Sequence, residues 1–261
     1  MTSSDLKMPV LFIGHGSPMN AIADNQYTNA LKNQAGLIPT PKAILVISAH
    51  WLTRGTFVCN ATKPQQIYDF YGFPDELYKI IYQPDGSKEF AELTADQLKS
   101  DEVKATENWG LDHASWAVLV HMYPKADIPV FEMSLNMEAD ESEHYNLGQK
   151  LDFLRNMGVL IIGSGDIVHN LRTMNYNPDV PAYDWAEAFE TQIKDALLTR
   201  DNERLIRYRD QIKDYNLALP TNEHYLPLLY VAALQQDHES IDFFHESIQH
   251  GSISMTSFKI G

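Results

Sequence analysis

The chain has little cysteine: Cys59 is the only one among 261 residues. A lone thiol can form neither an internal disulfide nor a thiolate metal site by itself. The beginning of the sequence, "MTSSDLKMPV", also lacks a basic segment followed by a long apolar stretch, so it does not have the pattern of a secretory leader. Together these features predict a protein of a reducing compartment, which we take to be the cytoplasm.

Positive charge and long apolar runs are scarce as well. Lysine and arginine number 20 against 35 acidic residues, which gives a formal net charge of −15. That balance repels phosphate backbones, so we expect no nucleic-acid partner. No window approaches the roughly 18 apolar residues that span a bilayer. We therefore expect no membrane association.

Several catalytic motifs are missing. No serine has the G-x-S-x-G spacing of a nucleophile elbow, which disfavours a serine hydrolase. "GSGDIVHN" has too few glycines for a dinucleotide fingerprint, and no P-loop lysine follows a glycine cluster. Ser17 and Ser164 are accordingly expected to be turn formers.

The pattern of apolar residues predicts one α/β domain over residues 1–261, with a central mixed, largely parallel sheet flanked by helices. Apolar strand-like runs and stretches of helical spacing follow one another along the chain. The predicted strands are Pro9–Ile13, Ala43–Ser48, Pro129–Leu135 and Val159–Gly163. The predicted helices are 87–100, 115–123, 140–158 and 184–201. The end of the chain, around Gly251, is predicted to add an antiparallel pair of strands.

Histidines fall at the ends of these elements. His15 follows the first strand, His50 the second, and His169 comes shortly after the strand that begins at Val159. Because parallel strands deliver their carboxyl ends to one edge of a sheet, these side chains are expected to converge there. His224 and His113 each precede a predicted helix, the latter with Ser115 as the expected N-cap. The other five histidines are expected to have no chemical role: His121, His144, His238, His245 and His250.

A cluster of neutral imidazoles at the sheet edge predicts a metal site with a catalytic role. Imidazole is the commonest nitrogen ligand of zinc and also suits iron, whereas structural zinc sites are rich in thiolates. Nearby polar residues are available to orient the rings: Ser17, Asp112, Asp166, Asn170 and Glu223. From spacing alone, a zinc hydrolase that activates water and a metal-binding protein without catalysis both stay open.

An aromatic segment, "DFYGFPDELY" (69–78), has two interpretations. Together with Tyr68, its Tyr71 and Phe73 could wall an aromatic substrate pocket. The same residues could equally pack on the core as an ordinary loop.

Six motifs in this order give a specific resemblance. "GHGSPMN", "SAHW", "YDFYGFPDELY", "GLDHASWAVL", "GSGDIVHNLR" and "EHYLPLLY" resemble the DOPA 4,5-dioxygenase (extradiol) family, which belongs to the class III extradiol ring-cleaving superfamily. The likeness covers nearly the whole chain from residue 9. It implies an α/β sandwich with a metal at the edge of its sheet, which agrees with the prediction from periodicity.

The resemblance also implies roles for individual residues. It assigns the metal to His15, His50 and His224. His169 matches a histidine that is either a fourth metal ligand or the acid/base. His113 matches one that contacts substrate or oxygen and is the other candidate for acid/base catalysis. Tyr225 and Phe73 are further expected to contact the substrate.

The reaction implied is insertion of O2 into the ring of a catechol such as L-DOPA, giving a ring-opened semialdehyde. The reactants are then a small catechol and O2, and no oligomeric state is predicted. Iron enzymes of the wider superfamily use two histidines and a glutamate, whereas the position of that carboxylate is His224 here. An all-histidine set suits Zn²⁺, but ring cleavage needs a metal that shares electrons. Zn²⁺ is thus the expected occupant, and Fe²⁺ is expected to be the metal competent for catalysis.

Overall fold

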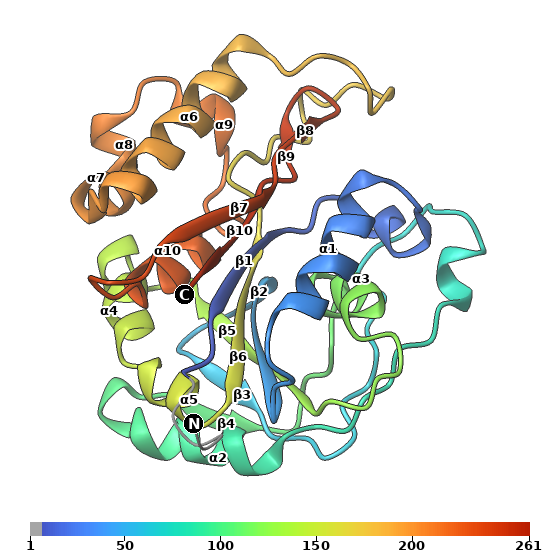
Figure 1. Ribbon diagram of the computed structural model, residues 1–261, viewed down its shortest axis with the longest axis vertical. Helices are drawn as coiled ribbons and strands as arrows, with labels where there is room; N and C mark the ends of the chain where they lie inside the picture. The colour runs from blue at the N-terminus through green and yellow to red at the C-terminus, as the bar shows by residue number, and fades with distance from the viewer. Residues whose placement is uncertain (1–6) are drawn as a thin grey trace.

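The computed structural model describes residues 7–261 and contains an eight-stranded sheet with helices on both faces (Figure 1). Most of the segment considered above as a leader lies outside the described residues. The strands of this sheet are β1 (Val10–Gly14), β2 (Ala43–Thr53), β3 (Phe57–Cys59), β4 (Lys104–Thr106), β5 (Val130–Asn136), β6 (Val159–Gly165), β7 (Ile241–His245) and β10 (Ser257–Ile260). Their order is β4-β3-β5-β2-β6-β1-β10-β7. A separate ladder joins β8 (Ile248–Gln249) to β9 (Ile253–Ser254).

The sheet is mixed and largely parallel, as predicted. Its centre, β5-β2-β6-β1, is parallel throughout. β10 pairs antiparallel with both β1 and β7, which confirms the antiparallel pair expected at the end of the chain. On the other side β3 is antiparallel to β5 and parallel to β4.

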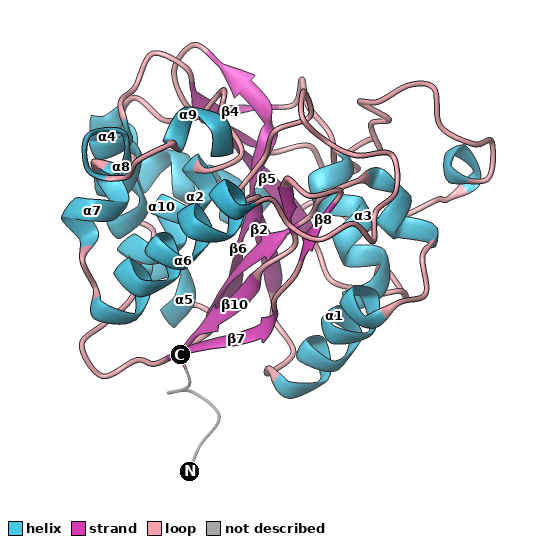
Figure 2. Ribbon diagram, turned by 90° about the horizontal axis from the view of Figure 1, so that it is seen from above, coloured by secondary structure: helices cyan, strands magenta, loops and turns pink. Residues whose placement is uncertain are grey.

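Helices cover the two faces of the sheet unequally (Figure 2). One face carries α1 (Gln26–Leu37), α3 (His113–Met122) and the short 3-10 helices η1 (Pro18–Ile22) and η2 (Leu77–Lys79). The other face carries α2 (Lys88–Gln97), α4 (Glu141–Gln149), α5 (Asp152–Asn156), α6 (Asp184–Thr199), α7 (Asn202–Ile206), α8 (Tyr208–Gln211), α9 (Tyr215–Ala218) and α10 (Leu226–Ala233), with η3 (Lys99–Asp101) following α2. Within residues 7–261, no helix has the length and apolar character needed to cross a bilayer.

The central strands are apolar throughout because both of their faces are buried. In β2, Ile44 and Val46 pack toward α1 and α3, whereas Leu45 and Ile47 pack into the core on the opposite face. Strands covered on both faces give continuous apolar runs in a sequence, without alternation of polar residues. This is why the central strands could be predicted from such runs.

Most boundaries lie within one to three residues of prediction, and three differences affect the site or divide an element. β2 does not end before His50 but continues to Thr53, because its pairing with β5 shifts register after Ile47 and resumes at Leu52. Helix α3 begins at His113, with Asp112 as its N-cap instead of Ser115. The helix predicted over 140–158 is two helices, α4 and α5.

A buried arginine joins distant parts of the chain near the start of β1. The Arg155 side chain is fully buried in α5 and donates from Nε to the Met8 carbonyl at 2.7 Å and from Nη1 to the Leu234 carbonyl at 2.8 Å. Two carboxylates balance its charge: Glu239, whose Oε2 lies 3.1 Å from Nη1, and the more exposed Asp152, whose Oδ1 lies 3.6 Å from Nη1. These bonds join the entry to β1, the end of α10 and the approach to β7.

Replacing Glu239→Gln should therefore lower the free energy of unfolding by about 3 kcal/mol, because it removes the nearer and more buried of the two carboxylates that face the Arg155 guanidinium. Urea unfolding followed by circular dichroism measures this change. The matched control is Glu203→Gln, which removes an exposed ion pair with Arg207 and should cost less than about 1 kcal/mol. Equal effects of the two substitutions would contradict the role given to the buried pair.

Candidate metal centre and active site

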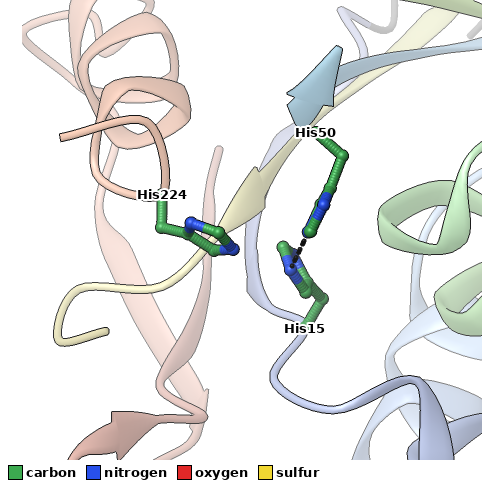
Figure 3. Close-up of side chains that lie close together, drawn as sticks. All are labelled: His15, His50 and His224. Carbon is green, nitrogen blue, oxygen red and sulfur yellow. Dashed lines mark hydrogen bonds between the residues drawn. The ribbon is translucent and has the colours of Figure 1, made fainter. Parts of the chain in front are cut away.

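Three imidazoles meet at the carboxyl ends of the parallel strands (Figure 3). His15 directly follows β1, His50 lies within β2, and His224 lies just before α10. One ring nitrogen from each lies within 4.8 Å of the others, and His15 Nε2 is 3.1 Å from His50 Nε2. His15 and His224 are buried, and His50 is half-buried. The structure therefore brings together the three residues to which the resemblance assigns the metal.

Glycine at the end of β6 allows His224 to reach this edge. Gly165 pairs with Gly14 of β1, so the two parallel strands end at the same level. The next residue, Asp166, donates its N–H to the His224 carbonyl at 2.8 Å. A Cβ on Gly165 would lie 2.0 Å from that carbonyl oxygen, far inside van der Waals contact. Only glycine lets the segment before α10 lie this close to the sheet.

Hydrogen bonding determines which nitrogen of His15 carries its proton. Ser164 Oγ donates to the Ala114 carbonyl at 2.7 Å, so this hydroxyl has only acceptor capacity left for His15 Nδ1, 3.1 Å away. His15 therefore donates from Nδ1. Its Nε2 then presents a lone pair to the space shared with His50 and His224.

The other two imidazoles are oriented by carboxylates. His50 Nδ1 lies 3.1 Å from Asp69 Oδ2, and His224 Nδ1 lies 3.1 Å from Glu223 Oε1. An ionised carboxylate only accepts hydrogen bonds, so both rings donate from Nδ1 and present Nε2 lone pairs. Metal-binding histidines commonly have such an oxygen acceptor behind the ring.

The environment keeps these rings neutral. Burial, and after it the neighbouring imidazoles, lowers the pKa of His15, His50 and His169 well below the usual value near 6.5. Burial also lowers the pKa of His224, against the opposing effect of Glu223. Neutral imidazoles have the lone pair that a metal requires.

Asp69 links the three-histidine group to His113. Its Oδ1 accepts the backbone N–H of His113 at 3.0 Å, and its Oδ2 accepts from His113 Nδ1 at 2.8 Å as well as from His50. Burial alone would raise the pKa of the Asp69 carboxyl, but the hydrogen bonds from His113 outweigh it and the pKa is lowered. The ring centroids of His50 and His113 are 4.1 Å apart. One carboxylate thus orients a ring of the three-histidine group and the imidazole beside it.

His169 occupies a different position. Its ring stacks flat on His224, with centroids 3.5 Å apart and planes 8° from parallel. Its donor atoms group with Asp166 and His224, outside the set formed by His15 and His50.

A buried carboxyl network lies behind the site. Glu132 of β5 accepts hydrogen bonds from Trp109 Nε1 at 2.8 Å and from the Asp112 N–H at 3.0 Å, and also from Ser115 Oγ. Asp112 in turn accepts from Ser48 of β2 at 2.7 Å. Burial raises the pKa of both carboxyls, that of Asp112 to about 6. This network attaches the start of α3, which carries His113, to the strands beside it.

Among the aromatic residues, Phe70 is the one in edge-to-face contact with His113, with ring centroids 5.6 Å apart. Phe73 packs against Phe70, one ring further from the site. Tyr225 does not reach the site: it is fully buried in the core, and its hydroxyl donates to the Leu205 carbonyl at 3.0 Å. His224, the preceding residue, faces the sheet edge, whereas Tyr225 faces the core. Tyr225 is therefore not placed to contact a substrate.

Sequence reasoning missed two residues that orient the imidazoles. Asp69 lies in an irregular segment, although its place in a dense aromatic motif was a signal. Ser164 was expected to be a turn former but lies inside β6 and fixes His15. Of the polar residues expected to orient a ring, Glu223 does so. Three others bond elsewhere: Ser17, Asp112 and Asn170.

The donor set fits a divalent cation. Two nitrogens bound to one zinc ion, each about 2.0–2.1 Å from it, lie at most about 4.2 Å apart. The 3.1 Å between His15 Nε2 and His50 Nε2 is within this limit. Because both rings carry their proton on Nδ1, the two Nε2 lone pairs face and repel each other. A cation between them would be attracted by both lone pairs.

Comparison with known proteins gives the class of this fold and site. Residues 10–260 match the family model described as the catalytic LigB subunit of aromatic ring-opening dioxygenase. The chain belongs to this family. It is therefore an extradiol ring-cleaving dioxygenase, a metal-dependent class of enzyme, and the zinc-hydrolase alternative is not supported.

Similar proteins support the same assignment. The chain is 42% identical to 4,5-DOPA dioxygenase extradiol of Escherichia coli (strain K12), over 99% of this chain and 96% of that protein. It is 37% identical to the 4,5-DOPA dioxygenase extradiol of Beta vulgaris, over 99% and 98% of the two chains. A crystal structure of an uncharacterized protein from Escherichia coli K12 superposes with a TM-score of 0.85 at 38% identity, covering 97% of this chain and all of that one.

Proposed function

We propose that His15, His50 and His224 hold a divalent cation and that the enzyme opens the ring of a catechol with an L-DOPA-like side chain. The observation that carries this proposal is the convergence of one ring nitrogen from each of three imidazoles, each of which has an oxygen acceptor at its Nδ1. The names of the relatives support the substrate class.

We propose Fe²⁺ as the catalytic metal, although Zn²⁺ suits the same three nitrogens. The cation, when bound, supplies a template for the two catechol oxygens and a route for electrons from the ring to O2. Zinc has no accessible redox change and cannot provide that route. Zinc bound at this site would therefore be a substitute without ring-opening activity.

His113 has the position and tautomer of a general base. Because its Nδ1 donates to Asp69, its Nε2 is free to take a proton from a catechol hydroxyl. The imidazolium that results is stabilised by the Asp69 carboxylate, as a buried aspartate stabilises histidine in hydrolase triads. His169, stacked on His224, is the second candidate for returning a proton to the product.

The aromatic segment would form the wall for the substrate ring. Phe70 stands against His113 and is backed by Phe73, so a planar catechol beside His113 would contact the Phe70 ring. We place Phe70 nearest the substrate and Phe73 behind it.

We propose further that the chain acts as one catalytic domain in a reducing cytoplasm. β1 and β10, from the two ends of the chain, are neighbours in the sheet. Dividing the chain into two domains would therefore separate paired strands. The lone Cys59 is buried and free, which agrees with a compartment that keeps thiols reduced.

The metal site is tested by zinc titration of His15→Ala. Loss of one of three nitrogen ligands should weaken Zn²⁺ binding at least 100-fold, since the remaining imidazoles retain their acceptors but no longer surround the ion. Competition with a chromophoric chelator measures the affinity. The exposed His238→Ala variant is the control and should bind as the wild type does. Wild-type affinity in His15→Ala would refute the site.

Activity is tested by loading the protein with Fe²⁺ without air and adding L-DOPA, then oxygenated buffer. Both atoms of O2 enter the product, so we expect one O2 consumed per catechol and a yellow ring-opened semialdehyde. An oxygen electrode and absorbance record the two quantities. Zinc-loaded protein should be inactive. Failure to consume O2 with L-DOPA and with other catechols would contradict the proposed substrate class.

The role of Asp69 is tested by Asp69→Asn and His113→Ala. His113→Ala should leave metal affinity within twofold and lower kcat by about 10²- to 10⁴-fold, the usual size of a general-base effect. Asp69→Asn should lower both kcat and metal affinity, because it releases His113 and His50 together. An Asp69→Asn variant with wild-type metal affinity would show that its bond to His50 is not needed for metal binding.

A further inference from the structure

A cavity beside the metal centre is left unused by the proposals above. Its volume is about 470 Å³, which lies within the usual range for small-molecule sites. Glu223, whose Oε1 is 3.1 Å from His224 Nδ1, forms part of its wall. Leu52, two residues after His50 in β2, forms another part. The cavity therefore borders the segments that carry two of the three histidines.

The lining of this cavity combines apolar and charged side chains. Its apolar part includes the buried residues Leu135, Leu219 and Leu226. Among the lining residues, all of which lie within 7–261, Arg209 supplies the one positive charge and Glu223 the one negative charge. These groups suit a small molecule with an apolar body and a zwitterionic end, because each of its charges then meets an opposite charge.

Arg209 has hydrogen-bonding capacity to spare. Its Nη2 lies 2.8 Å from Glu141 Oε1, and its Nε donates to the Tyr208 hydroxyl at 3.2 Å. Within residues 7–261, Nη1 has no hydrogen-bond partner. Asn222 also donates to Glu141 Oε1, at 3.1 Å, so Glu141 holds Arg209 beside the loop that contains Glu223. A guanidinium fixed at one side and open at the other can bind a carboxylate through its remaining N–H groups.

We propose that this cavity binds the amino-acid end of the catechol substrate, and that Arg209 pairs with its α-carboxylate. The inference rests on the proposed function and names the residue that selects an L-DOPA-like side chain over a simple catechol. The carboxylate of Glu223 then attracts the α-ammonium group. Because two carboxylates, Glu141 and Glu223, lie near the single guanidinium, a zwitterion is favoured over a plain anion.

A purely structural role for Arg209 would have a different signature. Its ion pair with Glu141 is partly exposed, with 48% of the Arg209 side chain accessible, and exposed pairs contribute little to stability. If Arg209 only supported the loop before α10, its loss would weaken the binding of every catechol alike. A contact with the α-carboxylate affects only the ligands that have this group.

The test compares L-DOPA with dopamine, which keeps the catechol and the ammonium group and lacks only the carboxylate. Titration calorimetry of the zinc-loaded protein without air measures binding without turnover. Wild type should bind L-DOPA about tenfold or more tightly than dopamine, the size expected for a charge-assisted pair. Arg209→Gln should bind the two ligands alike, with its affinity for dopamine within twofold of wild type. Arg207→Gln, which removes an exposed arginine outside the cavity lining, is the control and should keep the wild-type preference.

The same variant has a kinetic readout. In the Fe²⁺-loaded enzyme, Arg209→Gln should raise KM for L-DOPA about tenfold or more and leave kcat nearly unchanged, because the contact is made equally in the ground and transition states. An Arg209→Gln variant that keeps the preference for L-DOPA, or that loses affinity for both ligands equally, would overturn the proposal. Absence of O2 uptake by wild type with every catechol would instead refute the proposed function, and the calorimetric comparison would still decide whether Arg209 binds the carboxylate.

Discussion

The proton on Nδ1 is the constraint on which the site depends. An imidazole has two nitrogens, and only the one without a proton can bind a metal or accept a proton. In this protein the fold supplies an oxygen acceptor behind each ring of the three-histidine group: a serine hydroxyl in β6, a carboxylate in the aromatic segment and a carboxylate next to the third histidine. Each acceptor directs the opposite nitrogen inward. Convergence of the rings alone would not give a metal site, because a proton on Nε2 would block it.

The sharing of Asp69 connects the proposed metal site to the proposed general base, His113. His50 and His113 donate to the same carboxylate oxygen, so a displacement of that oxygen moves both rings. The buried Glu132 network supports the same arrangement from the other side, since it holds the start of α3 against β5 while Asp112 bonds to Ser48. His113 is thus fixed at its backbone by α3 and at its ring by Asp69. Asp69 and the Glu132 network therefore set the position of the proposed base.

The sequence predicts the central sheet and the convergence of His15 and His50 for the same reason, whereas the place of His224 in the set came from the resemblance. Strands buried on both faces are continuous apolar runs, and a polar residue such as His15 is readily seen where the run stops. His50 shows the weakness of this rule, because β2 passes through it and resumes pairing at Leu52. Asp69 could not be placed, since a segment without helix or strand gives no periodicity from which its position follows. Tyr225 was misplaced because adjacent residues at a helix start point in different directions.

The chain has several buried acids beside a site made of imidazoles, because these acids are satisfied by other means. A carboxylate in the core must be neutralised, hydrogen-bonded or paired with a cation. Glu132 and Asp112 take the second course, with donors from Trp109, Ser115 and Ser48. Asp166 has a donor for one oxygen only. Burial raises the pKa of its carboxyl well above the usual range, so Asp166 takes the first course and is neutralised. The carboxylates beside the site, Asp69 and Glu223, accept hydrogen bonds from His50 and His224, and the opposite ring nitrogens keep their lone pairs.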